Sequence, residues 1–115
     1  MTKAHVREIC LSLPHATEHV QWGNGLVFKV AGKMFAVSSL DPGPVFVAFK
    51  CTAEDFSALI ERPGVTPAPY LARAQWVAVE AENTLPRREL EPLLRKAHQT
   101  VAARLPQKDR SRLGL

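Results

Sequence analysis

The apolar positions of the chain follow a helical period at both ends and a strand period in the middle. In residues 3 to 13 they recur at the three–four spacing of one helical face, and Pro14 ends the segment. Residues 20 to 50 instead hold three short runs, LVFKV, MFAVSS and VFVAFK, rich in the Val and Phe that strands favour. The turn signals GNG, AGK and DPGP separate them. We therefore predict a meander of three antiparallel strands, with a possible short strand at 18–22 before it.

The second half of the chain predicts helix, strand and helix in that order. Thr52 and Asp55 have the spacing of a capping box, and Pro63-Gly64 ends the helix that they open. Prolines hold residues 64 to 75 extended, and apolar alternation predicts a strand at 76–81. Pro86 suits the first turn of a final helix. Its expected core face consists of Leu90, Leu93, Leu94, Ala97 and Val101.

This order predicts a single α+β domain over residues 1–115, α-β(3–4)-α-β-α, with helices packed on one face of an antiparallel sheet. The other face is expected to stay at least partly open, which makes it a candidate working surface. From about residue 106 the chain is short, polar and basic, and we expect a frayed tail there.

Composition narrows the class of protein. Apolar residues make up 46% and charged residues 23%, which excludes a disordered chain. The net charge of +4 makes an anionic partner such as nucleic acid plausible. No signal peptide or membrane-length apolar stretch is present, so the cytoplasm is the expected compartment and no membrane partner is expected.

Catalytic, metal and cofactor chemistry find little support in the pattern. Cys10 and Cys51 lack metal spacing, and neither has a recognisable histidine partner. The motif HATEH places His15 and His19 four apart, but Pro14 argues against the helix that such a metal site needs. GNG opens a strand and not a helix, so it is not a phosphate loop. We expect no enzyme activity, no metal and no cofactor.

A family resemblance covers nearly the whole chain. The matching segments are CLSLPHATE, QWG, VFKVAGKMFAV, VAFKCTAEDFSAL, PGVTPAPYLARAQWVAVE and LPRRELEPLLRKAH. In their order and spacing they resemble the MmcQ/YjbR family, small bacterial proteins described as DNA-binding with a double-wing motif. The resemblance implies an α+β fold related in shape to secretion-chaperone-like domains. One departure concerns residues 70–76, YLARAQW, where the family often has Asn and His.

Six residues are the candidate nucleic-acid contacts. Hairpin tips, the proline-rich segment and the last helix would present Lys33, Lys50, Tyr70, Arg73, Arg88 and Arg95 to a phosphate backbone. Each has a plainer alternative: lysines also protect sheet edges, and charge runs also form solvated helix faces. Both tryptophans, Trp22 and Trp76, are expected to fill the ends of the sheet.

The pattern thus favours a module that binds DNA weakly and mostly by charge. The alternative is a protein- or small-molecule-binding module that uses the open sheet face, including a homodimer formed through the sheet. An enzyme ranks last.

Overall fold

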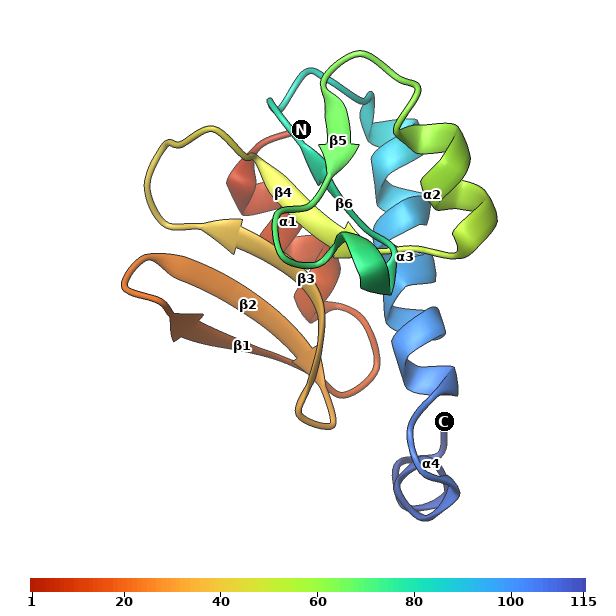
Figure 1. Cartoon of the computed structure of the whole chain (residues 1–115). Coiled ribbons are helices and arrows are strands. Elements are labelled where there is room, and N and C mark those ends of the chain that lie inside the picture. The colour runs from red at the N-terminus through yellow and green to blue at the C-terminus, as the bar shows by residue number, and fades with distance from the viewer.

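The computed structural model describes all residues, 1–115 (Figure 1). A six-stranded antiparallel sheet in the order β1-β2-β3-β4-β6-β5 forms one layer. In chain order the elements are α1 (Lys3–Leu11), β1 (Ala16–Gln21), β2 (Gly25–Val30), β3 (Lys33–Ser39), β4 (Val47–Lys50), α2 (Ala53–Leu59), β5 (Val65–Pro67), η1 (Ala72–Ala74), β6 (Trp76–Val79), α3 (Arg87–Ala103) and α4 (Gln107–Leu113).

Strands β2, β3 and β4 form the predicted meander, and β1 is the possible extra strand before it. The geometry of the first two turns follows from the sequence. The β1–β2 turn uses left-handed backbone at Trp22 and Gly23, and the β2–β3 turn uses it at Ala31 and Gly32. Glycine adopts that conformation at little cost, so each turn has a residue suited to it. The register shift opposite Phe28 and Lys29 marks a β-bulge in β3, where Phe35 is the extra residue.

The main core lies between one face of the sheet and the helices. It joins apolar residues of α1, α2 and α3 to Phe28, Phe35 and Phe49 of the sheet. The longest helix, α3, runs beside the strands and buries Leu90, Leu94, Ala97, His98 and Ala102. This arrangement confirms the predicted α+β class, with helices on one face of an antiparallel sheet.

The opposite face of the sheet is only partly open. The segment 68–76 folds over β4 and β6, and Ala48, Ala68, Trp76 and Ala78 form a second, smaller core there. Two hydrogen bonds fix this segment: Trp76 donates from its backbone to the Leu71 carbonyl at 3.2 Å, and Ala68 donates to the Trp76 carbonyl at 2.9 Å. The expected open face is therefore restricted to the β1–β3 part of the sheet.

Two local predictions were wrong, and a third was incomplete. The proline-rich segment is extended where it forms strand β5, which pairs with β6, but it turns at η1. The tail from residue 106 is helical rather than frayed: Leu105 and Leu115 on either side of α4 pack in or against the core, and a hydrogen bond of 2.7 Å joins His15 Nε2 to the Leu113 carbonyl. Trp22 does not fill an end of the core; it is 66% exposed at the β1–β2 turn.

None of the helices combines the length and the apolar composition that crossing a membrane would require.

Candidate nucleic-acid interface at one end of the sheet

A pocket of about 300 Å³ lies at the end of the sheet where β3 begins, β4 ends and β6 begins. The C-terminal end of α3 closes it on one side and η1 on the other. Its lining consists of Lys33, Met34, Lys50, Ala74, Trp76, Val101, Arg104 and Leu105. Three of these residues are cations and none is an acid, so the pocket is a locally positive site.

The cations at the rim of the pocket are exposed and have no carboxylate partner. Lys33 stands at the start of β3, directly after the β2–β3 turn, and Arg104 is the C-terminal cap of α3. Neither side chain takes part in an ion pair, although six such pairs exist elsewhere in the molecule. Both charges are consequently available to an anionic ligand.

Lys50 forms the floor of the pocket and corrects the sequence-based expectation. It was expected at an exposed strand end, but the residue is only 5% exposed. Its position opposite Trp76 in the β4–β6 pairing places it under the segment 68–76, where its ammonium donates to the Ala74 carbonyl. Burial lowers the pKa of Lys50 from its ordinary value, and the nearby charge of Arg104 lowers it further. Lys50 cannot meet a nucleic-acid backbone at the molecular surface.

The segment beside the pocket presents Tyr70 and Arg73. The Tyr70 side chain is wholly exposed, and its backbone has a φ of 65°, a left-handed conformation unusual for a residue other than glycine. Arg73 is exposed within η1, next to Ala74 of the pocket lining, and makes no ion pair. The structure therefore brings Arg73 to the same end of the sheet as Lys33 and Arg104.

The remaining two candidates lie elsewhere. Arg88 is in the first turn of α3, about 24 Å along the helix from Arg104, and lines a mixed-charge groove with Asp55 and Glu89. Arg95 is paired with Glu91 at 3.2 Å. Carboxylates therefore interrupt the positive charge along α3.

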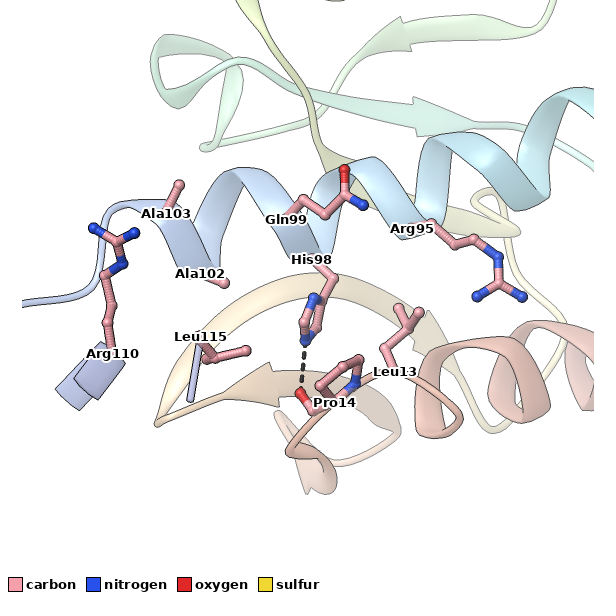
Figure 2. Close-up of a pocket in the computed structure, with 9 residues that line it drawn as sticks. All are labelled: Leu13, Pro14, Arg95, His98, Gln99, Ala102, Ala103, Arg110 and Leu115. Carbon is pink, nitrogen blue, oxygen red and sulfur yellow. Dashed lines mark hydrogen bonds between the residues drawn. The ribbon is translucent and has the colours of Figure 1, made fainter. Parts of the chain in front are cut away.

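Arg95 borders a second, larger pocket of about 410 Å³ on the other side of α3 (Figure 2). Its walls are mainly apolar, from Leu13, Ala102 and Leu115, and Arg95 and Arg110 extend from opposite ends of it. His98 is buried against it and shares a 2.8 Å hydrogen bond with the Pro14 carbonyl. Arg95 and Arg110 point away from each other (Figure 2), so their positive charges do not converge on one small anion, and this pocket is the weaker candidate for an anion.

The thiols and histidines are placed in structural roles. Burial raises the pKa of the Cys10 thiol to about 12 and that of Cys51 to about 11, so neither supplies a thiolate at neutral pH. His15 bonds to α4, whereas His19 bonds to Thr17 at 3.0 Å. No group of three or more His, Cys, Asp or Glu side chains is arranged to hold a metal ion.

The site could be found from the sequence only in part. Lys33 and Arg73 were singled out, and the structure places them at the same end. Arg104 was not among the six candidates, because a cation near a helix C-terminus is favourable by itself and needs no ligand. Nothing in the local pattern shows that the start of β3, the end of β4 and the end of α3 meet at one place.

Comparison with known proteins gives one family and a close structural match. A family model described as YjbR matches residues 11–100. The crystal structure of Deinococcus radiodurans protein DR2400, which has a DUF419 domain, is 29% identical and superposes with a TM-score of 0.89, covering 99% of this chain and 88% of that one. A Pseudomonas syringae protein of known structure is 18% identical with a TM-score of 0.71, covering 87% of this chain and 98% of that one, and supports the fold alone. No curated protein matches the chain.

Proposed function

Since the chain belongs to the YjbR family, we propose that it is a nucleic-acid-binding module that holds duplex DNA weakly through its charged end. The observation that carries the proposal is the gathering of Lys33, Arg73 and Arg104 at one end of the sheet with no carboxylate partner. The proposal is of a binding protein of the cytoplasm and not of an enzyme.

Contacts from these cations would give affinity for DNA without preference for a base sequence. Lysine and arginine bind phosphate oxygens, which carry no sequence information directly. Tyr70, exposed beside Arg73, supplies an aromatic surface on which an unpaired base can stack. Lys33 follows the β2–β3 turn and has the position of a wing tip. We therefore expect nonspecific binding, with a Kd of order 10⁻⁴ to 10⁻⁶ M at physiological salt.

Fluorescence anisotropy with labelled duplex DNA at two salt concentrations tests the proposal. Three neutralised phosphates correspond to a salt slope of about −2.7, so raising the salt from about 50 to about 200 mM should weaken binding roughly 40-fold. The variant Lys33→Glu should bind more weakly and lower the size of the slope by about 1. Arg88→Glu carries the same change of charge on the distant end of α3 and should bind as the wild type does. Absence of binding at the lower salt concentration would end the proposal.

A second candidate function is self-association, and the exposed apolar residues favour it. Three of the four large exposed hydrophobic residues are near the β1–β2 turn: Val20, Trp22 and Leu40, at 59%, 66% and 54% exposure. The Leu40 backbone donates to the Asn24 carbonyl at 2.8 Å, which places it beside that turn. Because β1 is an edge strand, a second copy could pair there and cover the patch.

Light scattering of the purified protein tests self-association, because it measures whether the molecular mass is that of a dimer or a monomer. A dimer formed through the patch should become monomeric when Trp22 is replaced by serine. Tyr70→Ser removes an exposed aromatic ring elsewhere and should leave the mass unchanged. A wild-type protein that stays monomeric at high concentration would contradict it.

A further inference from the structure

We propose that the pocket enclosed by Lys33, Lys50 and Arg104 binds a phosphate monoester, the group found at a nucleic-acid strand end and on free nucleotides. The inference rests on the proposed function only for the identity of the molecule that carries the phosphate. It assigns a role to Lys50, which a ligand lying across the surface cannot reach.

The first step of the inference is the unusual environment of Lys50. An ammonium has three donor hydrogens, and the structure gives this one a single partner, the Ala74 carbonyl. No Asp or Glu lines the pocket, and a second cation, Arg104, lies close enough to disfavour the charge of Lys50. A buried charge held beside another cation and without an anion is energetically costly. An anion entering the pocket would offset that cost.

The second step is the size and charge of the ligand. The pocket has the volume of about ten water molecules, enough for a phosphate group and the first atoms of its substituent. A monoester carries close to two negative charges and three terminal oxygens. Those oxygens match three cations that approach from β3, β4 and α3.

The third step distinguishes a terminal phosphate from the internal phosphates of a nucleic-acid backbone as the ligand of Lys50. Each is a diester flanked by two sugars, and Lys50 is 5% exposed at the bottom of the pocket. A terminal monoester has a substituent on one side only, so it is the form of phosphate best suited to reach Lys50. Trp76 lines the pocket but is itself 4% exposed, so it forms a wall and offers no open ring face to a base. The pocket therefore recognises the phosphate, and the remainder of the ligand extends outward past η1.

The test compares the affinities for two duplexes, one with 5′-phosphate ends and one with 5′-hydroxyl ends. Isothermal titration calorimetry measures the binding of inorganic phosphate as well. The wild type should prefer the phosphorylated duplex by about tenfold, the factor that one charge-assisted hydrogen bond supplies. Lys50→Met removes the ammonium and retains the apolar stem, so this variant should lose the preference. Lys33→Gln, at an exposed position that folding does not depend on, should reduce it. Lys29→Met, a lysine of β2 outside the pocket, should preserve it.

The outcomes separate this inference from the proposed function. Equal binding of both duplexes by the wild type, or a preference that persists in Lys50→Met, would overturn the phosphate pocket and leave DNA binding intact. Binding of inorganic phosphate that depends on Lys50, without binding of either duplex, would support the pocket and overturn the proposed function. Circular dichroism of Lys50→Met confirms that the variant is folded before its affinity is compared.

Discussion

Replacing Phe35 with alanine is expected to lower the free energy of unfolding by about 3–5 kcal/mol, the cost typical of emptying a buried aromatic site. The side chain is completely buried at the irregular part of β3, where Ala36 beside it is buried as well. Its ring meets the His98 ring edge-to-face at 5.2 Å and lies 6.5 Å from that of Phe28. The substitution therefore opens a cavity between the sheet and α3.

Urea denaturation followed by circular dichroism measures this effect, and Leu40→Ala is the matched control. Leu40 follows β3 on the same side of the molecule and is 54% exposed, so its truncation should change the stability by no more than about 0.5 kcal/mol. A loss below about 1 kcal/mol for Phe35→Ala would show that the contact between β3 and α3 is not the centre of the core.

Replacing Trp76 with alanine is expected to cost a comparable 3–5 kcal/mol and also to release the segment that borders the charged pocket. Trp76 is 4% exposed and joins Ala48, Ala68 and Ala78 in the smaller core. The backbone bonds that it shares with Leu71 and Ala68 depend on its position. Without the indole ring, little apolar area remains to hold residues 68–75 against the sheet.

Two measurements check the Trp76 prediction. Urea denaturation gives the stability, and limited digestion with trypsin under native conditions reports cleavage after Arg73, which should become faster because the segment opens more often. Trp22→Ala deletes the same side chain at a 66% exposed position and should change neither quantity. A larger loss of stability from Trp22→Ala than from Trp76→Ala would reverse the roles assigned to the two residues.

The contrast between these tryptophans shows how far sequence reasoning reaches. Both were expected to be packed, because large aromatic residues usually are. Trp22 occupies a left-handed turn position between two strands, and its side chain is directed by that backbone and not by its hydrophobicity. A local pattern cannot distinguish an aromatic residue that a turn leaves in water from one that a neighbouring segment covers.

Elements stabilised by local contacts were predicted, and those stabilised by distant contacts were not. The meander followed from alternation and glycine turns, and the cap of α2 from Thr52, whose hydroxyl accepts from the Asp55 backbone at 3.2 Å. β5 was missed because Pro67 disfavours a strand interior, whereas an edge strand tolerates a proline. α4 and the residues after it contact residues far away in the chain: Leu113 bonds to His15, and Leu115 packs against the core.

In the candidate site too, residues with a local signal were predicted, and residues placed by distant contacts were not. Lys33 could be identified because a turn signal precedes it, and Arg73 because it is a lone charge in a stiff segment. Lys50 was assigned to the surface because lysine is rarely buried. Its burial results from the folding of residues 68–76 over β4, a long-range event. His98 had a usable signal, since it continues the four-residue spacing of the buried Leu94 and Ala102.

The wholly exposed ring of Tyr70 gives the molecule a built-in optical label. It is the single tyrosine of the chain, so mild nitration would create one nitrotyrosine, whose absorbance can be followed without interference from a second one. Any large ligand that covered this part of the surface would shield the phenol from the reagent and slow the appearance of colour. A footprinting assay would thus need no engineered dye, and its one chromophore would report directly on the occupancy of a single loop.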